Sequence, residues 1–426
     1  MKVPDKCYLS YLEILREELV PAMGCTEPIA IAYAAARARD VLGVQPECVL
    51  VEVSRNIIKN VKSVVVPNTG GLKGVKASVA AGIIAGRTDK ALEVLSCIDD
   101  AGRERIKDFL DSKEIKVTET KSGLIFDLVV TVIAGQSKAS VRISNYHTNV
   151  VLVTKDDLTI YENQGCDEIE TTMLADRSLL NVKDILAFAE AVELKDVEEL
   201  LQCQIKYNMA IAKEGLKGDW GANVGKVLID AWGNDVKVRA KAMAAAGSDA
   251  RMSGCNLPVM ITSGSGNQGI TASVPVIVYA EELGVDKDTL LRALVVSNLV
   301  TIHQKTGIGQ LSAFCGAVSA GCGAGAGIAW LHGGGFQEVA HTIVNALATI
   351  AGIICDGAKP SCAAKIAVSI DAGILGFLMY ERGMQFYGGD GIVKKGVENT
   401  INNIGRLGRN GMHEIDKEII RIMLGE

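Results

Sequence analysis

The chain has few aromatic residues, few prolines and no excess of positive charge. Aromatic residues make up 4% of its 426 residues and only 8 residues are proline, whereas 48% are hydrophobic and 45 are glycine. A chain this apolar buries enough surface to offset its ordering entropy, which excludes a disordered protein. The formal net charge of −6 favours neither nucleic acid nor an anionic membrane surface as a partner. Few rings and many small residues predict a core in which backbones approach one another closely.

The sequence also lacks the signals of a secreted or disulfide-stabilised protein. Residues 1–6 contain no apolar stretch of the signal-peptide type. The 11 cysteines are an odd number, are spread along the chain and include no CxxC pair. We therefore expect a cytoplasmic location, where free thiols are available for chemistry or for metal binding.

One segment is long enough to raise the question of a membrane span. Residues 311–331 carry no charge over 21 positions, which meets the length of a spanning helix. However, 11 of these 21 residues are Gly or Ala, which contribute little to membrane insertion. We therefore expect a buried, tightly packed helix here and no membrane as a partner.

Local patterns predict helices and strands in the first part of the chain. A helix is expected over residues 26–42, because Thr26 can serve as its N-cap and Glu27 suits its positive end. Pro28 is tolerated in the first turn of such a helix. The other elements predicted here are helices over 9–20 and 73–85, and strands over 49–53, 124–133, 139–143 and 150–153.

The pattern changes after about residue 170. Strand signals become rare, and helical periodicity alternates with Gly-rich breaks over residues 182–423. The predicted fold class is an α/β N-terminal domain, with helices on a largely antiparallel sheet, followed by an all-α C-terminal domain. We place these domains at residues 1–175 and 176–426.

Three cysteines in the second part could bind a metal cluster. Cys355 and Cys362 would lie about 10.5 Å apart along a continuous helix, but Gly357 and Pro360 predict a loop that can turn both thiols inward. With Cys315 from another segment, they could hold a [4Fe–4S] cluster and leave one iron open. Buried, unreactive cysteines would give the same spacing, so both interpretations stay open at this point.

Cys25 is a candidate for acid–base or nucleophilic chemistry. It directly precedes the helix predicted at Thr26, and a positive helix end lowers the pKa of a thiol. The carboxylate of Glu27 partly opposes this effect. A small residue that fills a turn is the alternative interpretation.

Polar, glycine-rich loops form a third group of candidates. Residues 263–269 (Ser-Gly-Ser-Gly-Asn-Gln-Gly) and 68–71 (Asn-Thr-Gly-Gly) offer backbone N–H groups and amides to a phosphate or a carboxylate. Neither is a P-loop, which disfavours nucleotide binding. His147 lies in a further polar cluster, but the five histidines show no HExxH motif or zinc spacing. Such loops are often only turns.

Together these motifs resemble those of the oxygen-sensitive, iron–sulfur-dependent L-cysteine desulfidases, relatives of the bacterial iron–sulfur L-serine dehydratases. The resemblance extends over nearly the whole chain. The cysteine spacing of 40 and then 7 residues is that of the family's three cluster ligands. The other motifs are Gly24-Cys-Thr-Glu-Pro28, Asn56-Ile-Ile-Lys-Asn60, Val66-Pro-Asn-Thr-Gly-Gly-Leu-Lys-Gly74 and Ser263-Gly-Ser-Gly-Asn-Gln-Gly269.

Two features differ from the serine dehydratases. Those enzymes carry a Ser-His-Thr-x-Gly-Pro motif where this chain has residues 24–28, so Cys25 takes the place of their histidine. Some of them also end in a cysteine that blocks the open iron, whereas this chain ends Leu424-Gly425-Glu426. The fourth iron position is therefore expected to hold water or substrate. Both differences favour cysteine over serine as the substrate.

The resemblance implies a PLP-independent lyase that converts L-cysteine to pyruvate, ammonia and hydrogen sulfide. Its cofactor would be a [4Fe–4S] cluster held by Cys315, Cys355 and Cys362, with an open iron acting as a Lewis acid. Cys25 would remove the α-proton. The partner is a small amino acid, and homo-oligomer formation is left open. The expected substrate-binding residues are Thr26, Asn68, Thr69, Asn145, His147, Ser265, Asn267 and Gln268.

Three other functions remain open. L-Serine dehydration would be distinguished by comparing pyruvate formation from the two amino acids. An iron–sulfur redox or sensor protein usually holds its cluster with four cysteines rather than three, and has no need of the polar loops. A membrane transporter would require several spans.

Overall fold

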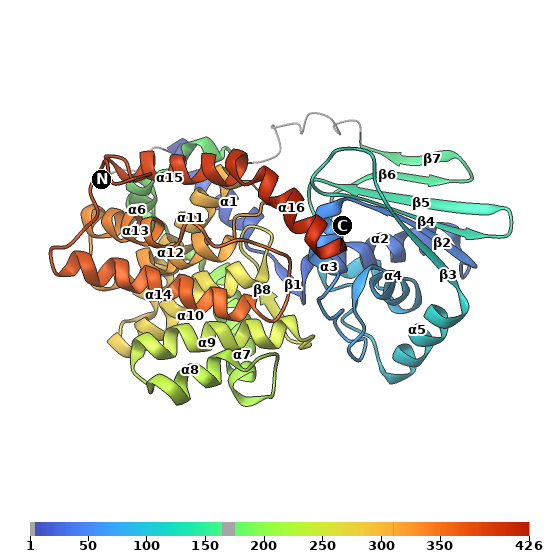
Figure 1. The fold of residues 1–426 in the computed structure, drawn as a ribbon, viewed down its shortest axis with the longest axis horizontal. Helices are drawn as coiled ribbons and strands as arrows, with labels where there is room; N and C mark the ends of the chain where they lie inside the picture. Colours follow the sequence, from blue (N-terminus) through green and yellow to red (C-terminus); the bar gives the residue numbers. More distant parts are fainter. Residues whose placement is uncertain (1–4, 164–174, 310, 426) are drawn as a thin grey trace.

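A six-stranded sheet with its helices lies beside a larger body of helices in the computed structural model (Figure 1). We refer to these as the sheet part and the helical part. The structure describes residues 5–163, 175–309 and 311–425. It confirms the predicted fold class, an α/β region followed by an all-α region.

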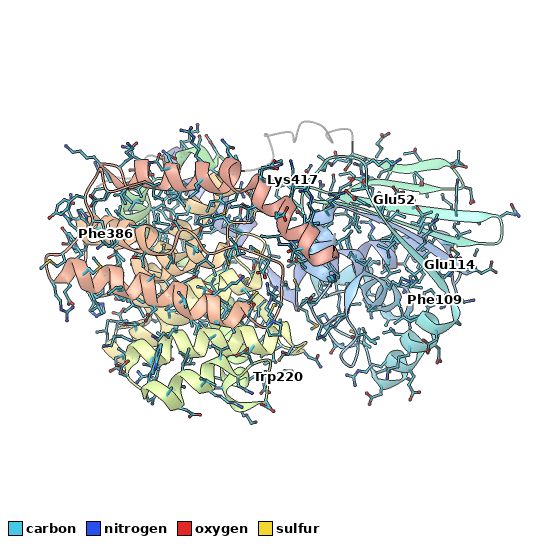
Figure 2. All side chains as sticks on the ribbon, viewed as in Figure 1. Glu52, Phe109, Glu114, Trp220, Phe386 and Lys417 are labelled. Atoms are coloured by element: carbon cyan, nitrogen blue, oxygen red, sulfur yellow. The ribbon has the colours of Figure 1, made fainter. Side chains whose placement is uncertain are left out.

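The sheet is largely antiparallel, as predicted. Its strand order is β3-β2-β4-β5-β6-β7, and only the β2–β3 pair is parallel. In β2, Val49 and Val51 are fully buried whereas Leu50 and Glu52 are exposed, so one face is covered and the other faces solvent (Figure 2). The strands are β2 (Cys48–Val53), β3 (Glu114–Glu119), β4 (Asp127–Ala134), β5 (Ser137–Ser144), β6 (Val150–Lys155) and β7 (Leu158–Glu162).

Helix α2 covers the inner face of this sheet, where it contacts β4 and β5. It has the predicted bounds, but the N-cap prediction was wrong: Cys25 is the N-cap, since its backbone is extended while Thr26 is already helical. The helices of the sheet part are α2 (Thr26–Leu42), α3 (Arg55–Val61), α4 (Gly74–Ala85), the 3₁₀ helix η1 (Thr88–Glu93) and α5 (Asp100–Ser112).

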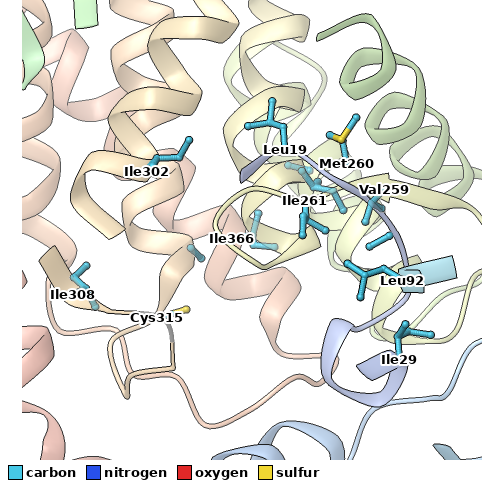
Figure 3. Packing of buried hydrophobic residues seen from close by; sticks show 14 of the residues in the cluster. Leu19, Ile29, Leu92, Val259, Met260, Ile261, Ile302, Ile308, Cys315 and Ile366 are labelled. Atoms are coloured by element: carbon cyan, nitrogen blue, oxygen red, sulfur yellow. The ribbon is translucent and has the colours of Figure 1, made fainter. Parts of the chain in front are cut away.

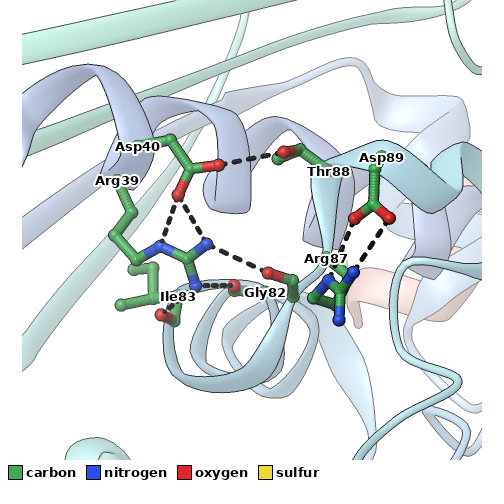
Figure 4. A network of polar contacts seen from close by, with 8 residues as sticks. Arg39, Asp40, Gly82, Ile83, Arg87, Thr88 and Asp89 are labelled. Carbon is green, nitrogen blue, oxygen red and sulfur yellow. Dashed lines mark hydrogen bonds and ion pairs between the residues drawn. The ribbon is translucent and has the colours of Figure 1, made fainter.

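Close backbone approach and one arginine hold α2 against α4. A Cβ at Gly82 would lie 2.2 Å from the carbonyl oxygen of Ala32, so only glycine fits there. The Arg39 guanidinium donates to the carbonyl of Ile83 (2.8 Å) and to the carboxylate of Asp40 (Figure 4). It thereby satisfies a carbonyl at the C-terminus of α4 that has no partner within the helix.

In the helical part, α12 is the central helix and is almost entirely buried. A Cβ at Gly321 would lie 2.3 Å from the carbonyl oxygen of Ser369, and one at Gly323 would lie 2.5 Å from that of Ser297. These contacts account for the small residues of the charge-free segment. The helices are α6 (Val182–Ala191), α7 (Glu198–Lys217), α8 (Val224–Trp232), α9 (Val236–Met252), α10 (Gly266–Leu283), α11 (Lys287–Ile308), α12 (Gly316–Leu331), α13 (Phe336–Ile350), α14 (Cys362–Glu381), α15 (Val397–Arg406), the π-helical turn η4 (Leu407–Gly411), α16 (His413–Leu424) and the short 3₁₀ helices η2 (Arg177–Leu179) and η3 (Leu194–Asp196).

One helix in the described part of the chain, α14, is long and apolar enough to cross a membrane. Its most apolar window is 56% buried inside the protein. A core helix of a globular protein passes the same length and composition test, so α14 is weak support for a membrane span.

The N-terminal helix packs against the helical part, and the C-terminal helix reaches the sheet part. Helix α1 (Asp5–Glu18) packs against α6 and α11 rather than against the sheet. Strand β1 (Pro21–Met23) pairs antiparallel with β8 (Pro258–Met260). At the other end α16 reaches α3, and Lys417 marks its position between the two parts (Figure 2). The boundary predicted at residue 175 follows residues 164–174, which lie outside the described ranges.

The hydrophobic core is continuous between the two parts. Figure 3 shows Ile29 and Leu92 of the sheet part in the same cluster as Ile302 and Ile366 of the helical part. All four side chains are at least nine-tenths buried. Residues placed along this junction are therefore held on both sides by packed structure.

Candidate active site

A cavity of about 120 Å³ lies where α2 and α3 meet the helical part. It brings together residues that are up to about 340 positions apart in the sequence. The polar and cysteine side chains that line it are Cys25, Thr26, Glu27, Lys59, Asn60, Arg251, Ser265, Asn267, Gln268, Lys305, Ser312, Cys315, Cys355 and Cys362. All four cysteines singled out from the sequence are among them.

Cys315 and Cys355 lie on two short paired segments. The backbone N–H of Cys315 donates to the carbonyl of Ile353 (3.1 Å), and that of Cys355 donates to the carbonyl of Ala313 (2.6 Å). Phe314 and Ile354 form the antiparallel bridge between these hydrogen bonds. Cys315 is also the N-cap of α12, so its thiol is held by both a helix start and a β-bridge.

Cys362 is the first residue of α14 and follows a loop, as predicted. Gly357 has φ of +89°, and a Cβ there would lie 2.4 Å from the carbonyl oxygen of Lys59. The loop therefore lies directly against α3, and only glycine permits this approach. Lys359 and Lys365 both pair with the carboxylate of Asp356, which fixes the loop on its other side.

The three thiols are close enough to influence one another's ionisation. Burial raises the pKa of Cys315 to about 12, and the neighbouring Cys355 and Cys362 add to this increase. Burial likewise raises the pKa of Cys362, and Cys355 adds to it. Among the described residues, no group of three His, Cys, Asp or Glu side chains is arranged to hold a single metal ion. Three thiols on the lining of one cavity are the type of donor that iron–sulfur clusters take.

Cys25 also lines the cavity and is 3% exposed. Its thiol donates a hydrogen bond to Glu27 Oε2 (3.0 Å). Cys25 forms a small buried cluster with Val64 and Met252, against which Cys362 packs. The expectation that the helix start lowers its pKa was wrong. Burial and the adjacent Glu27 carboxylate raise the pKa of this thiol well above its ordinary value, although Arg251 opposes them.

Glu27 is a site residue whose role in the cavity was missed from the sequence. It is buried and accepts hydrogen bonds from Thr26 Oγ1 (3.2 Å) and Asn60 Nδ2 (2.9 Å) in addition to the Cys25 thiol. Burial alone would raise the pKa of Glu27, but His147, the thiol hydrogen bond and Arg251 together lower it. A carboxylate hydrogen-bonded to a thiol can exchange a proton with it. From the sequence, Glu27 was expected only to suit the helix start and to oppose thiolate formation at Cys25.

Ser265, Asn267 and Gln268 line the cavity from the start of α10. The turn before this helix has positive φ at Ser263 (+50°) and Gly264 (+75°), which reverses the chain. A Cβ at Gly266 would lie 2.4 Å from Arg251 Nε, so this glycine admits the guanidinium against the loop.

Arg251, which was not anticipated, lies at the end of α9 and is 2% exposed. Its Nη1 donates to Asn267 Oδ1 (3.1 Å), whereas its Nε has no hydrogen-bond partner in the described structure. The available signal was a pair of charged residues, Asp249 and Arg251, that end an alanine-rich run. Charged side chains in a run of small residues must be buried against specific partners.

Four predicted substrate residues do not line the cavity. Asn68 donates to the Leu95 carbonyl (2.8 Å) and Thr69 to the Val66 carbonyl (2.7 Å), so both hold their own loop. Asn145 has φ of +66° and forms a turn after β5. His147 is absent from the cavity lining, and its ring centroid lies 4.8 Å from that of Phe126. Burial lowers the pKa of His147, and its Nε2 has no partner in the described structure.

Two buried lysines complete the lining. Lys59 of α3 forms an ion pair with Asp416 of α16. Lys305 of α11 donates to the carbonyl of Gly309, and burial lowers the pKa of this ammonium to about 8. The cavity is thus surrounded by three cationic side chains, one carboxylate and four thiols.

Comparison with known proteins identifies the family of this chain. A family model described as serine dehydratase alpha chain matches residues 88–421, which is more than half of the chain. The chain belongs to the serine dehydratase alpha chain family. Within this family the chain is 61% identical over 426 residues to a UPF0597 protein of Desulfitobacterium hafniense, covering 100% of this chain and 99% of the relative.

Other relatives match over nearly their whole length. A UPF0597 protein of Lachnoclostridium phytofermentans is 48% identical over 98% of this chain and 100% of its own length. One of Fusobacterium nucleatum is 44% identical over 97% of this chain and 98% of its own length. Membership in the serine dehydratase alpha chain family confirms the relation inferred from the motifs and indicates a lyase-type enzyme.

Proposed function

We propose that this protein is a cytoplasmic, [4Fe–4S]-dependent L-cysteine desulfidase, which eliminates sulfide from L-cysteine to give pyruvate, ammonia and hydrogen sulfide. The observation that carries the proposal is that Cys25, Cys315, Cys355 and Cys362 line one cavity. Three of these thiols match the family's cluster ligands in spacing, and the fourth stands where the serine dehydratases have a histidine. No pyridoxal cofactor is invoked.

Cys315, Cys355 and Cys362 would hold the cluster. Two of them are fixed by the β-bridge at Phe314 and Ile354, and the third by the loop that lies against α3. When bound, the cluster supplies a Lewis acid through the iron that no protein thiolate holds. All other steps are assigned to side chains of this chain.

In the proposed reaction, the Cys25 sulfur accepts the α-proton of the substrate. The thiol must first lose its own proton, and Glu27 is the acceptor in hydrogen-bond contact, with its Oε2 3.0 Å from Cys25 Sγ. This transfer is uphill, because the pKa of Cys25 is raised and that of Glu27 is lowered. The electron pair left on the α-carbon forms a double bond to the β-carbon as the carbon–sulfur bond breaks. Sulfide leaves, and the resulting aminoacrylate takes up water to give pyruvate and ammonia without further catalysis.

The second candidate function is dehydration of L-serine. It is favoured by the family description, serine dehydratase alpha chain, and differs only in the leaving group. The replacement of the dehydratase histidine by Cys25 favours a leaving group that needs less help from a proton donor. A thiol is more acidic than an alcohol, so it departs more readily as an anion.

The test is to purify the protein anaerobically and measure pyruvate released from L-cysteine and from L-serine. The proposal expects sulfide and pyruvate in equal amounts from L-cysteine, and a lower kcat/KM for L-serine. Iron and acid-labile sulfide content, measured on the same sample, tests the cofactor separately from the substrate.

A further inference from the structure

We propose that Arg251 and Gln268 form an amino-acid clamp, in which Arg251 binds the substrate carboxylate and Gln268 binds its ammonium group. This inference rests on the proposed function, because it places an α-amino acid in the cavity. It names the two residues that would distinguish an amino acid from other small molecules.

The first observation is an arginine without an ion-pair partner inside the protein. Arg251 is 2% exposed, and the Nε of its guanidinium has no hydrogen-bond partner in the described structure. Arg251 forms no direct ion pair among the described residues, although its charge acts on the nearby Glu27 carboxylate and lowers the pKa of that group. A buried guanidinium that makes no direct ion pair and keeps one N–H without an acceptor can bind a second anion in the cavity.

The second observation is an acceptor without a donor in the same cavity. Gln268 is 5% exposed, and its Oε1 has no partner in the described structure. Its Nε2 donates to the carbonyl of Ser263 (3.4 Å), which fixes the carboxamide with the oxygen as the unpartnered atom. A Cβ at Gly316 would lie 2.6 Å from this carboxamide, so the start of α12 also limits its position.

The loop at the start of α10 fixes the Arg251 guanidinium and the Gln268 carboxamide relative to each other. Asn267, which precedes Gln268, accepts a hydrogen bond from Arg251 Nη1 (3.1 Å). The absence of a side chain at Gly266 leaves room for the guanidinium beside the loop. The Arg251 guanidinium can donate to a carboxylate, and the Gln268 carboxamide oxygen can accept from an ammonium group. An α-amino acid carries both of these groups on one carbon atom.

Two probes that each lack one of these groups separate the two roles. 3-Mercaptopropionate has the carboxylate and the thiol but no amine, and cysteamine has the amine and the thiol but no carboxylate. Neither can form aminoacrylate or pyruvate, and their Kd values are measured by anaerobic calorimetry on the iron-loaded protein. Arg251→Gln should weaken 3-mercaptopropionate about 10- to 100-fold and leave cysteamine unchanged, since one charge-assisted hydrogen bond is lost.

Gln268→Met, which keeps the side-chain volume, should give the opposite pattern. It should weaken cysteamine and leave 3-mercaptopropionate unchanged. Arg239→Gln is the matched control, because Arg239 lies on the same helix and pairs with Glu282 at the surface; both Kd values should stay at the wild-type level. Arg251→Lys retains the charge and should bind 3-mercaptopropionate better than Arg251→Gln does.

The clamp is overturned if Arg251→Gln weakens both probes equally, weakens neither, or loses iron, since the last result would make Arg251 the counter-ion of the cluster. These measurements do not depend on turnover. If the protein acts on L-serine, the proposed substrate is wrong. The clamp would still be supported if Arg251→Gln weakens only 3-mercaptopropionate and Gln268→Met weakens only cysteamine.

Discussion

Cys315 and Cys355, which are 40 residues apart in the chain, lie on segments joined by two backbone hydrogen bonds. Cys355→Ala should therefore abolish the anaerobic iron chromophore, because two protein thiolates hold a cluster too weakly. Cys315→Ala and Cys362→Ala should have the same effect for the same reason. The matched control is Cys322→Ala, since Cys322 is fully buried within α12 and does not line the cavity. Full iron content in Cys355→Ala would remove this residue from the cluster site.

Cys25→Ala should lower kcat about 10²- to 10⁴-fold and leave the iron content unchanged, because a general base contributes about this much. Cys25→Ser should be nearly as inactive, since a serine hydroxyl is a far weaker proton acceptor near pH 7. The direct measurement is exchange of the substrate α-proton with deuterated solvent. If Cys25→Ala exchanges this proton at the wild-type rate, another residue is the base.

Asn267→Ala should raise KM for the amino acid, because Asn267 accepts a hydrogen bond from Arg251 and orients the loop at the cavity. The cluster spectrum should not change, since the Asn267 side chain hydrogen-bonds with Arg251 and Met252 and not with a proposed ligand. Steady-state kinetics with anaerobic protein give the comparison. A KM equal to that of the wild type would exclude Asn267 from substrate binding.

Asp416→Asn should reduce the free energy of unfolding by about 3 kcal/mol, because it leaves the Lys59 ammonium buried without its counter-ion. The Lys59 side chain is 1% exposed and that of Asp416 is 15% exposed. Glu418→Gln on the same helix breaks only an exposed pair with Arg421 and should change stability by less than about 0.5 kcal/mol. Urea unfolding measures both, and equal effects would show that α16 is not held by this ion pair.

Glu398 should make stability depend on pH in the acid range. Burial alone would raise the pKa of Glu398, but the hydrogen bond with His303 and the N–H of Val182 bring it below its ordinary 4.5. A lowered pKa in the folded state stabilises the protein above about pH 4.5, and this stabilisation is lost as the pH falls through the folded value. Wild type should therefore be more stable than Glu398→Gln at pH 7, and the difference should shrink at pH 4. A constant difference would contradict the assignment.

Much of the fold could be predicted from local pattern. The signals at residues 26–28 predicted where α2 begins to within one residue, although the N-cap is Cys25, and the alternation in residues 49–53 predicted β2. The position of α1 could not be predicted, because an amphipathic helix specifies a buried face but not which part of the protein covers it. The short helix α3 was missed because its seven residues are too few to show a helical period.

Site residues with a characteristic spacing could be predicted from the sequence, whereas polar residues of a type common in loops could not. Cysteine spacing identified three residues that the fold brings to one cavity. Asn68 and Ser265 could not be told apart, because polar residues beside glycine either bind a ligand or hold a turn. The pKa of Cys25 could not be foreseen either, since burial depends on Met252 and Val64, which pack against it from distant segments.

The most direct test of the account is the product balance of anaerobically purified, iron-loaded protein supplied with L-cysteine. We predict that hydrogen sulfide and pyruvate appear in equal amounts, at a kcat/KM above that for L-serine, and that removal of iron with a chelator abolishes both. Undiminished release of sulfide and pyruvate from iron-free protein, or pyruvate from L-serine with none from L-cysteine, would contradict the central claim.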